Sequence, residues 1–109
     1  MTTPDRGDVI VLNLDPQVGH EQMKRRPALV LSPARFNDVF GVAFVAPITT
    51  KPKGNVFEVA LPTGLRVKGS VLAHQLKVLD WRARRAAPAG KAPIDVVDRV
   101  ADIVKEIVS

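Results

Sequence analysis

Short apolar and β-branched runs, separated by turns rich in proline and glycine, fill the first three quarters of the chain. These runs are four to seven residues long, which is typical of strands and too short for ordinary helices. We therefore expect strands over residues 8–14, 27–31, 42–46, 56–61, 69–72 and 76–79. Residues 34–38 predict a single helical turn or a loop, and residues 86–90 are the stretch most like a linker.

The last segment has a different pattern. Between residues 93 and 108, valine, isoleucine and alanine recur at helical spacing, and charged residues occupy the other face. Pro93 and Asp95 suit a first helical turn. Valine and isoleucine are mediocre helix formers, so packing must stabilise this helix, and we expect it to close the open side of the sheet. A detached helix that binds a partner is the alternative, which the broad apolar face disfavours.

Together these elements predict an α+β fold that is mostly β. It is a small antiparallel sheet curled toward a barrel, with short helices and a C-terminal amphipathic helix. The 109 residues form one domain, 1–109, with residues 1–5 expected to be flexible and the C-terminal helix over 93–108. A hydrophobic share of 46% with 25% charged residues is ordinary globular composition, which excludes global disorder.

Cysteine is absent, which excludes disulfides, thiolate catalysis and cysteine-based zinc sites. The first residues lack the apolar core of a signal peptide, and no apolar stretch reaches the length of about 18 residues that a membrane span requires. We therefore expect a cytoplasmic protein without a membrane partner.

Charge is unevenly spread along the chain. The net charge is +5, but residues 1–92 carry +7 and the remaining residues carry −2. The positive charge of residues 1–92 favours the binding of polyanions, through electrostatic steering and the release of counterions. The alternative is that this charge only keeps the protein in solution.

One stretch, residues 19–27, concentrates candidate chemistry. It places Glu21 before three consecutive cations, Lys24, Arg25 and Arg26, in a loop between two predicted strands. Arginine presents a planar fork of donors and lysine a compact charge, so such a loop suits a phosphate group. Taken alone, the stretch is equally consistent with an ordinary solvated loop.

Several short motifs occur in a fixed order from about Arg6 to the C-terminal helix. They are RGDVIV (6–11), DP (15–16), GHEQ (19–22), RPALVLS (26–32), PITT (47–50), GSV (69–71), QLK (75–77) and DWRAR (80–84). Each motif is weak, but the ordered set closely resembles the MazF/PemK family of toxin–antitoxin endoribonucleases.

This resemblance implies an SH3-like barrel of the MazF/PemK/CcdB type that assembles as a homodimer. It implies cleavage of single-stranded RNA at a short sequence, with the ribose 2′-hydroxyl as nucleophile and with no metal or other cofactor. It also implies inhibition by a cognate, MazE-like antitoxin, whose acidic tail occupies the same groove as RNA.

The resemblance further assigns three catalytic residues. Arg26 matches the family's catalytic arginine, and because arginine stays protonated at neutral pH we expect it to stabilise charge. Thr49 matches a threonine whose hydroxyl donates to a phosphate oxygen or holds the 2′-oxygen, whereas by itself it is an ordinary strand-end residue. Glu21 matches a loop glutamate that accepts the 2′-hydroxyl proton or positions Arg26; an ion pair with Lys24 or Arg25 is the alternative.

A larger set of polar residues is expected to contact RNA. These are His20, Lys24, Arg25, Lys51, Lys53, His74, Gln75, Arg82 and Arg84. Two of them depart from the family, because Arg25 stands where some members have histidine and His74 stands where many have aspartate. Histidine side chains can exchange protons, which would suit His74 to acid–base chemistry, although a lone histidine is more often structural. Trp81 could stack on a base, but its apolar neighbours favour a place in the core.

Two other functions remain open at this point. One is a non-catalytic toxin of the same fold that poisons a protein target, as gyrase-directed, CcdB-like proteins do. The other is an RNA-binding regulator that has lost activity through the changes at Arg25 and His74. Arg26 and Thr49, with the Glu21 loop, favour the ribonuclease.

Overall fold

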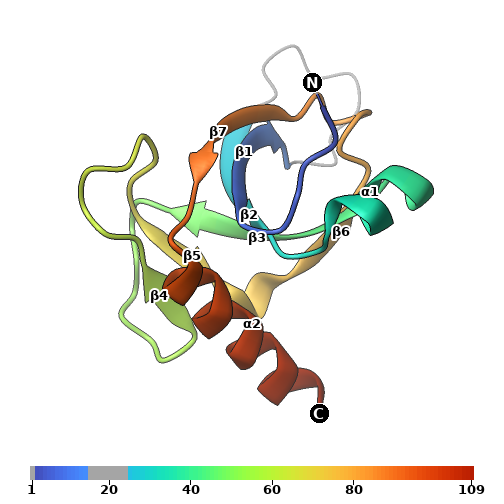
Figure 1. Ribbon diagram of the computed structural model, residues 1–109. Helices are drawn as coiled ribbons and strands as arrows, with labels where there is room; N and C mark the ends of the chain where they lie inside the picture. The colour runs from blue at the N-terminus through green and yellow to red at the C-terminus, as the bar shows by residue number, and fades with distance from the viewer. Residues whose placement is uncertain (1, 15–24) are drawn as a thin grey trace.

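The computed structural model describes residues 2–14 and 25–109 (Figure 1). The elements, in chain order, are β1 (Asp8–Asn13), β2 (Arg25–Val30), α1 (Ala34–Phe40), β3 (Ala43–Thr49), β4 (Glu58–Ala60), β5 (Ser70–Leu72), the 3₁₀ turn η1 (Ala73–Gln75), β6 (Lys77–Leu79), β7 (Ala87–Lys91) and α2 (Ile94–Val108). Neither helix in these ranges has the length and the apolar composition of a membrane-spanning segment.

All strand pairs are antiparallel, in the order β4-β5-β3-β2-β1-β7, with β6 also paired to β3. The long strand β3 joins the two halves of the sheet. Its first residues pair with β6, its middle with β2, and its last two residues, Ile48 and Thr49, with β5. The mostly β, antiparallel fold expected from the pattern of short strands is confirmed.

Alternation along the strands divides the core into two clusters, because successive side chains point to opposite faces of a sheet. On β1, Val9 packs in one cluster with α2, whereas Ile10 and Leu12 pack in the other. α2 contributes its buried valines, Val100 among them, to the first cluster and covers that side of the sheet (Figure 1). The C-terminal helix therefore closes the sheet, as its apolar face predicts.

Most of the stretch that looks like a linker, residues 86–90, instead belongs to strand β7 (Ala87–Lys91), which pairs with β1 at the edge of the sheet. An edge position tolerates Pro88, since the amide hydrogen that proline lacks is not needed there. Ala89 is buried, and Lys91 forms an ion pair of 2.8 Å with Asp8. The strand contains alanine, proline and glycine but no β-branched residue, so the sequence pattern did not predict it.

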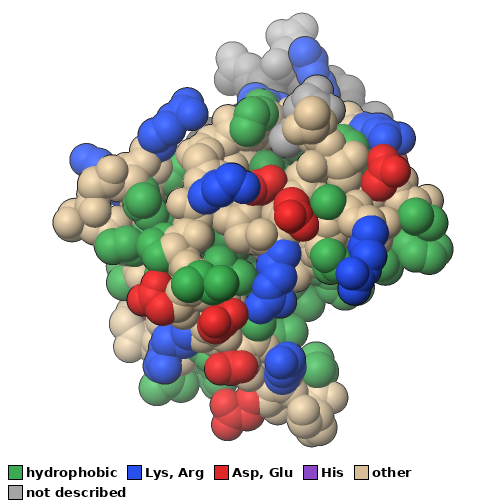
Figure 2. Space-filling model, in the orientation of Figure 1, with side chains coloured by type: hydrophobic (Ala, Val, Ile, Leu, Met, Phe, Trp, Pro, Cys, Tyr) green, Lys and Arg blue, Asp and Glu red, His purple; other side chains and the backbone are tan. Residues whose placement is uncertain are grey.

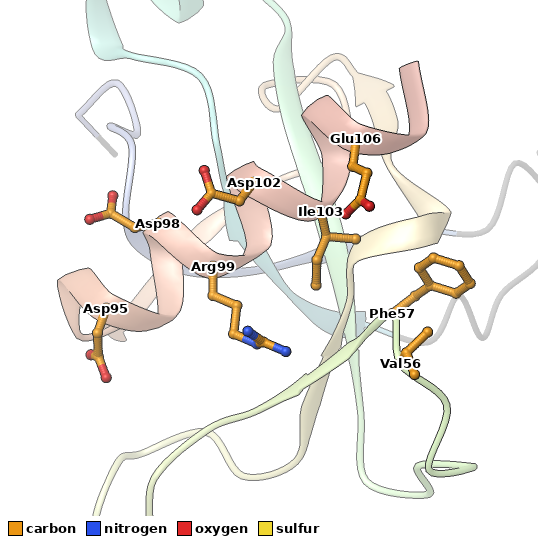
Figure 3. Close-up of a pocket in the computed structure, with 8 residues that line it drawn as sticks. All are labelled: Val56, Phe57, Asp95, Asp98, Arg99, Asp102, Ile103 and Glu106. Atoms are coloured by element: carbon orange, nitrogen blue, oxygen red, sulfur yellow. The ribbon is translucent and has the colours of Figure 1, made fainter. Parts of the chain in front are cut away.

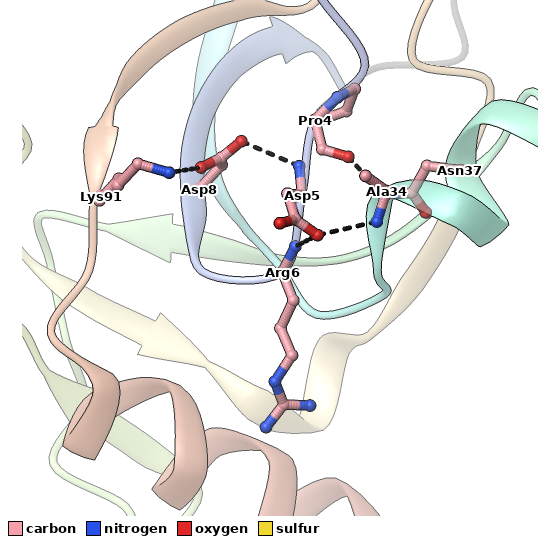
Figure 4. A network of polar contacts seen from close by, with 7 residues as sticks. All are labelled: Pro4, Asp5, Arg6, Asp8, Ala34, Asn37 and Lys91. Carbon is pink, nitrogen blue, oxygen red and sulfur yellow. Dashed lines mark hydrogen bonds and ion pairs between the residues drawn. The ribbon is translucent and has the colours of Figure 1, made fainter.

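Pro4 and Asp5, which belong to the stretch expected to be flexible, contact α1 (Figure 4). Pro4 is buried, and its carbonyl accepts a hydrogen bond of 2.8 Å from the Asn37 side chain. Asp5 accepts the backbone N–H groups of Ala34 at 2.8 Å and of Arg6 at 2.9 Å. These two bonds, the one from Ala34 first, lower the pKa of Asp5.

Trp81 lies in the second cluster and is 3% exposed. Its indole N–H donates to the Asn37 carbonyl at 3.1 Å, which satisfies the polar end of the ring. The core position predicted for Trp81 is confirmed, and base stacking is excluded because the ring is covered.

Candidate active site

Arg26 and Thr49 lie at the same end of the sheet on neighbouring strands. The β2–β3 register ends at the pair Ala28–Pro47. Arg26 lies two residues beyond that pair on β2, and Thr49 lies two residues beyond it on β3. A step of two residues preserves the face of the sheet, so both side chains belong to the face of Ala28 and Pro47.

Both side chains are accessible. Arg26 is exposed, and Thr49 is half-buried. The Thr49 Oγ1 accepts the backbone N–H of Lys51 at 3.1 Å, which leaves the hydroxyl proton available for donation to a bound group. The sheet therefore presents a guanidinium group and a hydroxyl donor on one face, at one end.

The neighbouring strand β5 holds Thr49 in place. Thr49 pairs with the buried Ser70, and the preceding residue, Gly69, lies directly against the Thr49 backbone. A Cβ at Gly69 would lie 2.1 Å from the Thr49 carbonyl oxygen. Gly69 also has φ +127°, which glycine adopts without strain. The sequence pattern gives no sign that Gly69 and Ser70 support Thr49, although GSV (69–71) is among the motifs.

Arg25 and Arg26 point to opposite faces of β2, because they are adjacent strand residues. The Arg25 guanidinium donates to the Val11 carbonyl at 3.0 Å. Of the consecutive cations, the two that the structure describes therefore lie on different faces: Arg26 shares its face with Thr49, and Arg25 does not.

The loop after β3 carries Lys51 and Lys53, which are both exposed. The Glu58 carboxylate organises this loop by accepting the backbone N–H groups of Lys53 at 3.0 Å, Gly54 at 2.6 Å and Asn55 at 3.2 Å. These bonds, with the one from Lys53 first, lower the pKa of Glu58. Glu58 therefore fixes the path of the chain between Thr49 and β4, and the strand predicted over 56–61 shortens accordingly.

The hydrogen bonds between Glu58 and this loop should break only at a pH below the ordinary pKa of glutamate. Because the pKa of Glu58 is lower in the folded chain, the bonds to residues 53–55 persist below the ordinary pKa of glutamate and are lost only as pH falls through the depressed value. We expect the amide signals of Lys53, Gly54 and Asn55 to shift together in an NMR titration at that low pH. In Glu58→Gln the transition should be absent; the same transition in that variant would show that another group causes it.

The other residues expected to bind RNA are spread around the fold. His74 and Gln75 lie on η1, and the His74 ring packs against Phe57 with ring centroids 5.8 Å apart. The chain from Ser70 to His74 runs away from Thr49, because β5 is antiparallel to β3. Arg82 lies over the Trp81 ring, 4.6 Å from its centroid.

Arg82 also pairs with Asp38 at 3.6 Å. Arg84 is half-buried, and its guanidinium donates to the carbonyls of Asn13 and Leu14. Three predicted site residues, His20, Glu21 and Lys24, lie outside the described residues.

A cavity of about 790 Å³ lies between α2 and the segment Val56–Phe57 (Figure 3). Four carboxylates of α2 line it: Asp95, Asp98, Asp102 and Glu106. In Figure 2 acidic side chains gather over the lower part of the molecule, where Figure 1 places α2. A polyanion would be repelled there, so this cavity is not a candidate RNA site.

Comparisons with known proteins identify the family of the chain. The PemK-like, MazF-like toxins of type II toxin–antitoxin systems match residues 5–108. The chain is 46% identical over 87 residues to the endoribonuclease toxin MazF of Escherichia coli strain K12, covering 80% of this chain and 78% of that protein. It is 41% identical over 101 residues to the endoribonuclease toxin ChpB of the same strain, covering 86% and 84%.

Solved structures give the same result. A chain of a MazE–MazF crystal structure from Deinococcus radiodurans matches with a TM-score of 0.91 and 48% identity, covering 97% of this chain and 96% of that chain. A crystal structure of MazF from the same organism matches with a TM-score of 0.89 at the same identity and coverage. The chain therefore belongs to the PemK-like, MazF-like family of toxins of type II toxin–antitoxin systems.

Proposed function

We propose that this chain is an endoribonuclease toxin that cleaves single-stranded RNA, including mRNA, at the end of the sheet where Arg26 and Thr49 lie. The observation that carries the proposal is their placement on one face, two residues beyond the same strand pair, with both side chains accessible. The +7 charge of residues 1–92 supports a polyanionic substrate. Relatives named endoribonucleases support the reaction class.

The chemistry follows from the donors. The ribose 2′-oxygen attacks the adjacent phosphorus, the bond from phosphorus to the 5′-oxygen breaks, and the products are a 2′,3′-cyclic phosphate and a 5′-hydroxyl end. Arg26 donates to the non-bridging oxygens as negative charge builds up on them. Thr49 donates to a phosphate oxygen or holds the attacking 2′-oxygen. Glu21 accepts the 2′-hydroxyl proton or orients Arg26, and Arg26 also serves as a source of the proton for the leaving oxygen.

The remaining basic and polar residues would extend the path of the RNA. Lys51 and Lys53 follow Thr49 directly and are the best placed, because the Glu58 bonds fix their loop beside the candidate site. We assign weaker contacts to His20, Lys24, Arg25, His74, Gln75 and Arg82. Cleavage of mRNA would take place in the cytoplasm, and the reaction requires no metal.

Two protein partners are part of the proposal. The first is a cognate, MazE-like antitoxin whose acidic tail covers the basic site; the solved MazE–MazF complexes that the chain resembles support this partner.

The second partner is another copy of this chain. An apolar surface supports it: Leu76 and Val104, together with Leu31 and Phe44, line a cavity of about 200 Å³, and Val78 of β6 pairs with Phe44. Val78 is 51% exposed, and exposed apolar patches mark protein interfaces. Sedimentation at twice the chain mass of 11.8 kDa would support the dimer, and sedimentation at the chain mass would contradict it.

The decisive experiment is incubation of the purified chain with a long RNA in EDTA. We expect fragments with 5′-hydroxyl ends, clustered at one short sequence. A substrate with a single 2′-deoxy ribose at that sequence should resist, since the internal nucleophile is gone. Intact RNA with a folded dimer would reject the ribonuclease in favour of the non-catalytic toxin or the inactive regulator.

A further inference from the structure

Arg84 is attached to the end of strand β1 by three hydrogen bonds. Its Nη1 atom donates to the carbonyl oxygens of Asn13 and Leu14, each at 3.0 Å. In return, the backbone N–H of Asn13 donates to the Arg84 carbonyl at 3.0 Å. Carbonyl oxygens at a strand end that accept no hydrogen bond from the protein must accept one from water. Here one guanidinium donates to two of them.

The segment that carries Arg84 is a compact turn. The Asp80 carboxylate accepts the N–H groups of Arg82 at 3.1 Å and Ala83 at 2.9 Å, and the Asp80 carbonyl accepts that of Arg84 at 3.1 Å. The buried Trp81 fixes this turn to the core. The backbone turn from which the Arg84 side chain extends to β1 is therefore itself held in place.

The end of β1 in turn supports the catalytic end of β2. Leu12 pairs with Arg26, and Asn13 pairs with Arg25. Arg84 donates a hydrogen bond to the carbonyl of Asn13, and Asn13 is the residue next to Leu12, the partner of Arg26. A displacement of this strand end would therefore move Arg26 relative to Thr49, which lies on a different strand.

We infer that Arg84 is a positioning residue for RNA cleavage: it fixes the end of β1 and thereby the place of Arg26, rather than contacting a phosphate group as the sequence suggested. This inference rests on the proposed ribonuclease function. Reacting groups must be held to a fraction of an ångström, so a loosened strand end lowers the rate of the chemical step while leaving RNA affinity intact.

The test is single-turnover cleavage of a short RNA by Arg84→Gln, with Arg85→Gln as the matched control. Arg85 is the next residue, is exposed, and loses the same charge. We expect Arg84→Gln to lower the maximal rate by on the order of 10²-fold. The enzyme concentration that gives half the maximal rate, and its dependence on salt, should match those of Arg85→Gln.

A phosphate contact gives the opposite result. The maximal rate of Arg84→Gln would be unchanged, half-saturation would need more enzyme, and the salt slope would fall by about 0.7 for one lost contact on a single strand. Should Arg84→Gln fail to fold, Arg84→Lys takes its place. This variant keeps the charge but replaces the planar fork by a point donor, so a lowered rate supports positioning and a normal rate overturns it.

Amide hydrogen exchange gives a readout that needs no RNA. In Arg84→Gln the amides of Asn13 and Arg26 should exchange faster than in Arg85→Gln, because the strand end has lost its anchor. Equal exchange in the two variants would overturn the inference. If the wild-type chain does not cleave RNA, the proposed function fails, and the exchange comparison still decides whether Arg84 holds β1.

Discussion

Replacing Arg26 by alanine is expected to lower the maximal rate of RNA cleavage by about 10³-fold, the cost of removing one preorganised donor from a developing oxyanion. Arg26 is exposed at a strand end, so the free energy of unfolding should change by less than about 1 kcal/mol. Single-turnover cleavage and urea unfolding of the same preparation measure both quantities.

A matched control is Arg35→Ala, which removes an exposed arginine from α1. It should cleave RNA at nearly the wild-type rate, because α1 carries no residue of the proposed site. Equal losses of rate in the two variants would mean that net charge, and not the position of Arg26, matters. A rate loss in Arg26→Ala accompanied by unfolding would also contradict the assignment.

Replacing Gly69 by alanine should have the largest effect on stability. The new Cβ would lie 2.1 Å from the Thr49 carbonyl oxygen and 2.8 Å from its carbonyl carbon, and the backbone φ of +127° is strained for any other residue. A clash with backbone cannot be relieved by a side-chain rotation. We expect the free energy of unfolding to fall by about 3 kcal/mol or more, measured by urea denaturation.

Gly64→Ala separates the clash from the backbone strain. Gly64 also has a positive φ, +95°, but no atom lies within 4 Å of its would-be Cβ. The free energy of unfolding of Gly64→Ala should fall by only about 1 kcal/mol. Gly69→Ala should also cleave RNA more slowly at temperatures where it is still folded, since it displaces Thr49. Similar stability losses in the two variants would show that β5 does not press against the Thr49 backbone as described.

The pattern of apolar residues was sufficient to predict most of the fold. β-Branched runs such as residues 8–14 form strands because their side chains fill a half-buried, pleated surface. The stretch 86–90 shows the limit of this approach: alanine, proline and glycine become the edge strand β7 only because β1 is there to pair with them. Val56 and Phe57, which look like strand residues, are exposed because Glu58 turns the preceding loop.

The candidate site was less accessible to sequence reasoning. Composition indicated a polyanion, but only the resemblance singled out Arg26 and Thr49, and only the strand register places them at one end of the sheet. Adjacent cations in the sequence suggested a cluster, whereas strand alternation sends Arg25 to the other face. The contacts of Arg84 depend on a turn and a strand that are 70 residues apart in the sequence, so no local pattern reveals them.

A double-mutant cycle on Arg26→Ala and Thr49→Val, read out as maximal single-turnover rates, tests most directly whether the two side chains serve one phosphodiester. If they do, the double variant cleaves scarcely more slowly than Arg26→Ala alone, because groups that act as a unit lose their effects together. If the two losses multiply, Arg26 and Thr49 act independently, and a shared site at this end of the sheet is wrong.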